Sequence, residues 1–246
     1  MNETLQTILQ HRSIRSFTND KITQEQINTI VEAAQMASTS SYMQAYSIIG
    51  VTNPQKKEAL AQVSGQPYVK DNGHLFIFCA DLYRHQIKAT EEQLENMKAN
   101  LENTEHLLVS TIDAALAAQN AAIASESMGL GMCYIGSLRN DIQQVDTILN
   151  LPPHVIPLFG MVIGVPAKEP EQKPRLPLEG VYFENEYNRN QDSSLNQFDA
   201  TIKQYYENRS NNKRIDSWTD QMLRRFQNTM RMDVTPYVES KGFKKR

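Results

Sequence analysis

The longest helical pattern in the chain, residues 105–128, constrains the fold most because alanine dominates it. Alanine has the highest helix propensity and the smallest side chain that retains it, so other elements can approach such a helix closely from several sides. Gly129 then supplies a residue that can end the helix in the left-handed conformation. We expect a core helix here, which is also a candidate subunit contact. Its alanines are Ala114, Ala115, Ala117, Ala118, Ala121, Ala122 and Ala124.

Apolar runs predict the strands that pack on this helix. Residues 75–80 form a continuous apolar run without alternation, which is typical of a central strand covered on both faces. Residues 46–52 and the latter half of 155–164 predict further strands. Helical spacing over residues 24–37 follows a capping box that begins at Thr23. These elements alternate without a linker, which favours one domain.

Composition is that of an ordered globular protein, with 40% hydrophobic and 22% charged residues in 246. The first residues lack a basic region followed by an apolar run, so we expect no secretory signal. We also expect no membrane span, because no apolar stretch approaches the length of a bilayer crossing. Cys79 and Cys133 lie inside apolar segments, where a free thiol behaves as a small hydrophobe. A reducing, cytoplasmic setting fits this pattern.

Charge is distributed unevenly along the chain. Residues 201–246 carry 11 Lys and Arg against 5 Asp and Glu (net +6), and the remainder carries 14 against 23 (net −9). A basic segment on an acidic body can attract an anionic partner. The segment has no nucleic-acid-binding signature, so we expect a small phosphorylated ligand rather than nucleic acid.

Three cationic stretches are candidate anion sites. Arg12 and Arg15 flank Ser13, and two guanidinium groups with a hydroxyl between them suit a phosphate. Lys173 and Arg175 alternate in a proline-rich segment, so in an extended chain they point the same way. Residues 208–214 form a polar, basic loop. From the residues alone, ordinary exposed charge is the alternative for each stretch, and for Arg12 and Arg15 local chemistry favours the interpretation that they complement a helix end.

Conventional catalytic constellations are missing from the sequence. The histidines lack metal-ligand spacing, neither cysteine is part of a Cys-x-x-Cys motif, and no nucleophile elbow occurs. Ser137 stands where a P-loop has its lysine, and Gly129-x-Gly131 lacks the third glycine of a dinucleotide fingerprint. The run Ser38–Ser41 is either a ligand-lining loop or a solvated turn. If the chain is an enzyme, a cofactor carries its chemistry.

Six stretches, taken in order, resemble the oxygen-insensitive NADPH nitroreductases and NADPH–flavin reductases, and together they cover nearly the whole chain. They are His11–Phe17, Ser40-Ser41 with Gln44, Gly65-Gln66, Tyr134–Arg139, Lys173–Pro177 and Ser210–Arg214. The resemblance implies an α+β fold, with a mixed central sheet wrapped by helices, over a single FMN-binding domain at 1–246. Residues 181–246 would form a C-terminal arm and helices. It also implies an intertwined homodimer with two FMN sites at the subunit interface.

The same resemblance assigns site residues. The FMN phosphate would be held by His11, Arg12, Ser13, Lys173 and Arg175. The ribityl chain and ring edge would be contacted by Arg15, Ser40, Ser41 and Gln66, and backbone near the ring would come from Ile135, Gly136 and Ser137. The 2′-phosphate of NADPH would be held by Arg209, Lys213 and Arg214. Ser137 departs from the glycine pair usual in the family, and Gly65-Gln66 is one residue shorter than the Gly-Gly-Gln of some relatives.

The implied function is an NADPH-dependent flavoprotein reductase with no metal. NADPH would deliver hydride to flavin N5 and leave, and a nitroaromatic, a quinone or free flavin would then take the electrons. No catalytic side chain is implied, although Arg15 is a candidate for stabilising charge at the ring. Two alternatives stay open: a flavin-binding carrier or sensor without turnover, and a scaffold that binds a phosphorylated metabolite.

Overall fold

The chain forms two compact units in a computed structural model that describes residues 1–209 and 213–246. The first unit comprises residues 1–170 and 231–246, and the second comprises residues 171–230. The assignment of both to a single FMN-binding domain stays a prediction. Each unit is described by itself.

A four-stranded sheet forms the centre of the first unit. Its strands are β1 (Tyr46–Val51), β2 (His74–Asp81), β3 (Gly131–Ile135) and β4 (Val155–Gly164), in the order β1-β2-β4-β3. Strand β2 is buried along its whole length and pairs with both β1 and β4, so the predicted central strand is confirmed.

The sheet is antiparallel across its four strands rather than mixed, which corrects the expectation from the resemblance. Among the described residues, parallel pairing is limited to an isolated bridge between Ser13 and Met132. Strand direction escaped the sequence analysis because an uninterrupted apolar run indicates burial on both faces, and burial does not fix direction.

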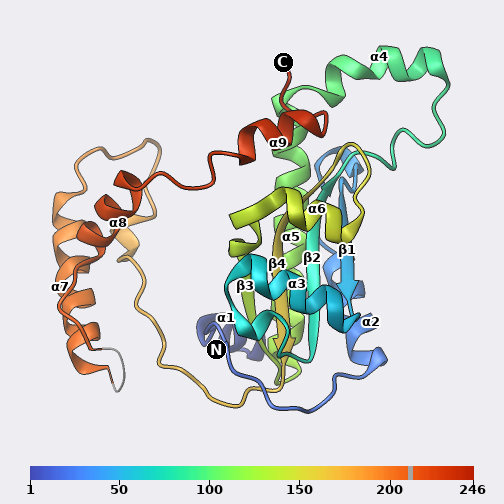
Figure 1. The fold of residues 1–246 in the computed structure, drawn as a ribbon. Coiled ribbons are helices and arrows are strands. Elements are labelled where there is room, and N and C mark those ends of the chain that lie inside the picture. The colour runs from blue at the N-terminus through green and yellow to red at the C-terminus, as the bar shows by residue number, and fades with distance from the viewer. Residues whose placement is uncertain (210–212) are drawn as a thin grey trace. The chain divides into compact units, whose positions relative to one another are not determined.

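Helices cover both faces of this sheet (Figure 1). Alternate residues of β2 take opposite sides: Phe76 and Phe78 pack with α2 (Gln24–Gln35) and α5 (Thr104–Ser127), whereas Leu75 and Ile77 pack with α3 (Pro54–Ser64) and α6 (Ile142–Leu149). The remaining elements of this unit are α1 (Glu3–Leu9), η1 (Ser40–Tyr42), η2 (Pro67–Val69), α4 (Glu91–Leu101), η3 (Gly136–Asp141) and α9 (Val234–Ser240).

Helix α5 is the predicted core helix. Ala114, Ala117, Ala118, Ala121 and Ala122 are buried on it, and Gly129 lies just beyond its end with φ 74°. Among the described helices, α5 is the one with the length and apolar composition of a membrane span, contrary to the expectation that no stretch approaches that length. Its alanine face packs on α2 and the sheet, as in the core helix of a globular protein.

The second unit consists of η4 (Leu178–Gly180), α7 (Asp192–Asn208) and α8 (Trp218–Gln227). Its small apolar cluster comprises Phe198, Ile202 and Tyr206 from α7, with Trp218 packed against them. Helices were expected within residues 181–246, and α7 and α8 lie there.

Candidate functional site

The N-terminal motif, residues His11–Phe17, is hydrogen-bonded to the first residues of β3. Ile14 donates its backbone N–H to the Met132 carbonyl at 2.9 Å, beside the Ser13–Met132 bridge. The buried Ile14 side chain lies where a Cβ on Gly131 would meet it at 2.5 Å, so only glycine permits this approach. Because Ile14 is held in this way, its neighbours Ser13 and Arg15 extend from a fixed position beside β3.

The cations of this motif are paired with carboxylates of the same chain. His11 Nδ1 lies 2.7 Å from Glu126 Oε1, and Arg12 Nη1 donates to Glu169 Oε2 at 3.0 Å. The Arg12 pair is largely exposed, and such pairs contribute little to stability. Arg12, Glu126 and Glu169, together with Gly129–Gly131, line a pocket of about 210 Å³. An anion that enters the pocket must displace Glu169 from Arg12.

Arg15 lies close to Cys133 and Tyr68. Burial raises the pKa of the Cys133 thiol, and Arg15, Ser13 and Tyr68 act on it in the opposite direction. Tyr68 belongs to η2, which begins directly after Gln66. Arg15 and the Gln66 segment, far apart in sequence, are therefore neighbours here. Arg15 itself is exposed and free to contact a ligand.

A left-handed turn directs the chain into Gln66. Gly65 has φ 65° and ends α3, and the Gln66 backbone N–H is bonded to Ser64 Oγ at 3.2 Å and to the Ala61 carbonyl at 3.3 Å. Since the backbone donor is occupied, Gln66 has only its half-buried side-chain amide to offer a ligand.

Ile135, Gly136 and Ser137 span the end of β3 and the start of η3. Ile135 is buried, and a Cβ on Gly136 would lie 3.3 Å from Arg139 Nη2, which is a tight contact. Arg139 also donates to the Leu158 carbonyl, and burial lowers its pKa. Ser137 is half-buried. Arg139 therefore occupies the space beside the Gly136 Cα.

The serine loop, residues 39–45, carries Ser40 and Ser41, and both are exposed. Asp113 on α5 accepts backbone N–H groups from Ser40 at 3.0 Å and from Ala45 at 3.1 Å. The loop leads into β1 at Tyr46, which pairs with Ala80 near the end of β2.

One chain does not bring the serine loop and the N-terminal motif together. The loop is tied to Asp113 and the motif to Glu126, two positions separated along α5 by about 20 Å at a rise of about 1.5 Å per residue. Strand β2 gives the same separation. The serine loop lies next to Ala80 and the N-terminal motif lies at the level of His74, and this length of strand spans about 20 Å at about 3.3 Å per residue. Two halves of the predicted flavin site therefore lie at opposite ends of the sheet.

Lys173 and Arg175 belong to the second unit, in an extended segment. Both are exposed, and Arg175 Nη1 donates to the Lys173 carbonyl at 2.6 Å. Their predicted role with the N-terminal motif stays a prediction.

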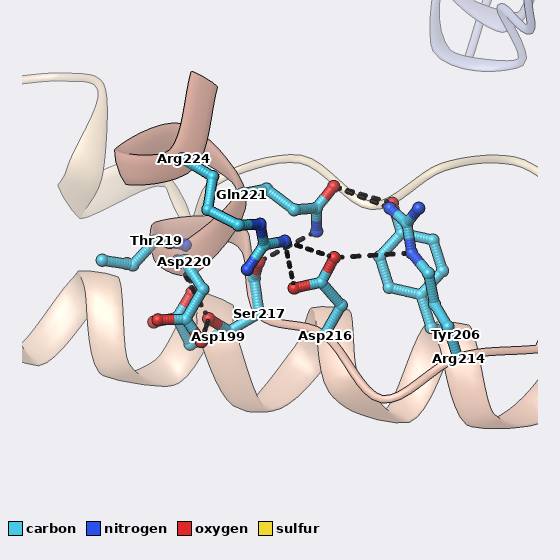
Figure 2. A network of polar contacts seen from close by, with 9 residues as sticks. All are labelled: Asp199, Tyr206, Arg214, Asp216, Ser217, Thr219, Asp220, Gln221 and Arg224. Atoms are coloured by element: carbon cyan, nitrogen blue, oxygen red, sulfur yellow. Dashed lines mark hydrogen bonds and ion pairs between the residues drawn. The ribbon is translucent and has the colours of Figure 1, made fainter. Parts of the chain in front are cut away.

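The cations predicted to bind NADPH lie near the end of α7 and the start of α8. Arg214 stacks over Tyr206, with its guanidinium carbon 4.1 Å from the ring centroid, and donates to Gln221 Oε1 at 2.8 Å. Asp216 lies between Arg214 and Arg224 (Figure 2). Hydrogen bonding from Arg224 lowers the pKa of Asp216.

Arg209 lies over Tyr205 and Tyr206, at 5.7 and 5.9 Å from the ring centroids. Lys213 is exposed. Ser210, Asn211 and Asn212, also part of the predicted basic loop, lie outside the described residues.

Sequence analysis missed three residues that shape these sites: Asp113, Glu126 and Tyr68. For Asp113 a signal was present, because a lone carboxylate inside an alanine-rich helix must be either exposed or hydrogen-bonded. Glu126 and Tyr68 carried no local signal, since only the fold brings them to the N-terminal motif.

Comparison with known proteins links this geometry to one group of enzymes. Residues 8–165 match the sequence profile described as "Nitroreductase family", and residues 173–246 match "Nitroreductase family, C-terminal domain". The chain is 55% identical over the full length of both chains to "FMN reductase (NADPH)" of Bacillus subtilis. It is 46% identical, again over the full lengths, to "NADPH-dependent oxidoreductase" of Staphylococcus saprophyticus.

Solved structures agree with these sequence relatives. The NfrA1 nitroreductase from B. subtilis matches with a TM-score of 0.92 at 52% identity, covering 99% of this chain and all of that one. The NADPH:FMN oxidoreductase from Vibrio harveyi, solved with NAD+, matches with a TM-score of 0.89 at 40% identity over the full length of both chains.

Proposed function

This protein belongs to the nitroreductase family, and we propose that it reduces flavin and related acceptors with NADPH by a two-step exchange through bound FMN. It is an oxidoreductase. The observation that carries the proposal is its 55% identity, over the full length of both chains, to an NADPH-dependent FMN reductase. Free flavin is the proposed acceptor, with nitroaromatics and quinones as further acceptors. The cytoplasm is its proposed compartment.

The donors of the candidate site fit the chemistry of FMN. Arg12, Ser13 and His11 supply guanidinium, hydroxyl and imidazole groups suited to a phosphate, with Lys173 and Arg175 as their proposed complement. The exposed hydroxyls of Ser40 and Ser41 and the Gln66 amide suit a polyhydroxyl chain and a polar ring edge. Gly136 packs against Arg139, and the proposed contact of this segment with the ring is through its backbone.

When bound, FMN supplies reversible two-electron chemistry, accepting a hydride from NADPH and giving the electrons to the acceptor. Arg15 contributes a fixed positive charge beside the Gln66 segment, where it stabilises negative charge on a reduced ring or a nitro oxygen. No side chain acts as nucleophile in this proposal, so the protein contributes positioning and electrostatics. Arg209, Lys213 and Arg214 are proposed to hold the 2′-phosphate of NADPH.

We propose that each flavin site is shared between two copies of this chain in a homodimer. The N-terminal motif and the serine loop lie about 20 Å apart within one chain, and a second copy can place its serine loop against the first copy's motif. Near the level of Asp113, α5 exposes Leu108, Ile112 and Leu116, which follow one another at a spacing of four residues and form an apolar stripe.

Subunit complementation tests the shared site. One variant carries Arg12→Ala and Ser13→Ala, the other carries Ser40→Ala and Ser41→Ala, and each alone should lose FMN. Random exchange of subunits should restore about a quarter of the FMN sites, because half the dimers are mixed and each mixed dimer has one intact site. A site built within one chain would give no restoration, since every chain carries a defect.

Anaerobic reduction separates the enzyme from a flavin carrier. The purified protein should show flavin absorbance that NADPH bleaches and that an added acceptor restores. Flavin absorbance that NADPH leaves unchanged would support the carrier, and a protein that takes up no flavin would remove both functions.

A further inference from the structure

The serine loop adopts a backbone conformation that its sequence does not favour. Ser41, Tyr42 and Gln44 have φ of 50°, 59° and 49°. This left-handed region is unfavourable for residues with a Cβ, which approaches the next carbonyl oxygen there. Three such residues among four consecutive positions persist only where the surrounding structure holds them.

A buried carboxylate on α5 holds both ends of this loop. Asp113 is 1% exposed, and its two oxygens are used separately: Oδ1 accepts the N–H of Ser40 at 3.0 Å and Oδ2 accepts the N–H of Ala45 at 3.1 Å. Hydrogen bonds to an ionised group are stronger than neutral ones. One rigid helix therefore fixes the points at which the loop leaves and rejoins the packed structure.

Several contacts act inside the loop, among them a hydrogen bond of 2.9 Å from the Met43 N–H to the Ser40 carbonyl. Thr39 Oγ1 accepts the Gln44 N–H at 3.3 Å, and His85 Nε2 lies 2.8 Å from the Met43 carbonyl, so Nε2 carries the proton. The Thr39–Gln44 bond joins the two ends to each other but not to the core. Asp113 ties both ends to α5, and at Ala45 the carbonyl also accepts the Asp81 N–H of β2 at 3.0 Å.

We propose that Asp113 is a positioning residue for the flavin, because it keeps the loop that presents Ser40 and Ser41 in its left-handed, ligand-ready conformation. The identity of the ligand rests on the proposed function. The role of Asp113 in ordering the loop does not, because the order of the loop can be measured without flavin. A loop that is closed for only a fraction of the time weakens binding by that same fraction.

Hydrogen exchange on the full-length protein without flavin tests the loop. In the unaltered chain, the amides of Ser40 and Ala45 should exchange slowly, together with the core of α5. Asp113→Asn keeps the shape but replaces one acceptor oxygen by a donor, so both amides should exchange about tenfold faster or more. Fast exchange of both amides in the unaltered chain, or unchanged rates in the variant, would overturn the proposal.

Flavin titration tests the consequence. Asp113→Asn should raise the dissociation constant of FMN about tenfold while kcat at saturating FMN stays near its original value. Asp146→Asn is the matched control: Asp146 is another buried carboxylate of this unit, bound to Tyr237 and Lys241. It should lower the unfolding temperature and leave FMN affinity within about twofold. Equal loss of FMN affinity in both variants would mean that Asp113 acts only through global stability.

A substitution that relieves backbone strain at position 42 should partly compensate for Asp113→Asn, and a purely structural role of Asp113 would not produce this compensation. Tyr42 is 83% exposed and has no assigned contact with flavin. Glycine at position 42 adopts φ 59° without the steric cost of a Cβ, whereas alanine keeps that cost. The loss caused by Asp113→Asn should therefore be smaller in a Tyr42→Gly background than in a Tyr42→Ala background. Equal losses in the two backgrounds would overturn the proposal. If the unaltered protein binds no FMN, the proposed function fails while the exchange measurement still decides the role of Asp113.

Discussion

Single cations in this protein are held by acceptors that an anionic ligand can replace or supplement. Arg214 combines a ring contact with Tyr206 and a hydrogen bond to Gln221, and Arg12 pairs with the exposed Glu169. A guanidinium held by several contacts loses less conformational freedom on binding phosphate than a free one. Discrimination between NADPH and NADH is expected to depend on single cations of this kind.

Arg209→Ala combined with Lys213→Ala should raise KM for NADPH at least about tenfold and change KM for NADH little, because only NADPH carries the 2′-phosphate. Steady-state kinetics with both nucleotides measure the ratio. Arg225→Ala is the control, an exposed cation on α8 with no assigned role, and should leave the ratio unchanged. Equal effects on both nucleotides would contradict the assignment.

His74 makes the stability of the fold dependent on pH. Burial, and secondarily Lys57, lowers the pKa of His74 from 6.5 to about 4, and its Nε2 has no hydrogen-bond partner among the described residues. The unfolded chain takes up this proton near pH 6.5 while the folded chain does so only near pH 4. The free energy of unfolding therefore falls as the pH is lowered through that interval.

We expect a loss on the order of 1–2 kcal/mol at pH 5 relative to pH 7.5, measured by urea denaturation. His74→Phe should flatten this part of the profile, since an apolar ring next to Phe76 leaves no buried group to protonate. A profile that keeps its full slope in His74→Phe would assign the effect to another group.

At the scale of elements, the short helix α9 shows how tertiary contacts create structure that sequence patterns do not predict. It has only seven residues, with a proline inside, and it was not predicted. Tyr237 donates to Asp146 Oδ2 at 2.5 Å, and Lys241 Nζ lies 2.6 Å from the same oxygen. These contacts attach α9 to α6, and Phe243 is buried just beyond it.

Lys241→Met should destabilise the protein by about 3 kcal/mol, because it leaves a buried carboxylate without its cation. Tyr237→Phe should cost only about 1 kcal/mol, since Asp146 keeps its lysine. Denaturant unfolding monitored by circular dichroism compares the two variants. A larger loss in Tyr237→Phe would show that packing around the ring, rather than the charge, controls this attachment.

At the scale of the whole molecule, the exposed stripe on α5 connects assembly to function. Leu108, Ile112 and Leu116 are 52%, 54% and 45% exposed on a helix whose other face is buried. A shared flavin site requires that a second copy approaches the molecule, and an apolar helix face is suited to such a contact.

Ile112→Glu should therefore produce monomers that also lose FMN, because a charge within an apolar interface costs several kcal/mol. Light scattering with size-exclusion chromatography gives the mass, and absorbance gives the flavin content of the same fractions. Leu94→Glu, on α4, should stay dimeric and retain FMN. Monomers with full flavin content would contradict the shared site.

The sequence by itself determined the main strands and helices and supplied the candidate residues of the site. The apolar run at 75–80 became β2 and the alanine-rich pattern became α5, because burial and helix propensity are local properties of side chains. The capping box at Thr23 formed as predicted. The candidate FMN and NADPH residues came from motifs and their order along the chain.

Only the tertiary structure decided how these pieces meet. The sheet is antiparallel, Glu126 and Asp113 lie under the N-terminal motif and the serine loop, and the two halves of the proposed flavin site lie at opposite ends of β2. Pairings between residues far apart in sequence depend on strand direction and helix placement, which local patterns do not encode. Asp113 illustrates the difference: its sequence position indicates an unusual buried charge, and only the fold reveals that it holds the serine loop.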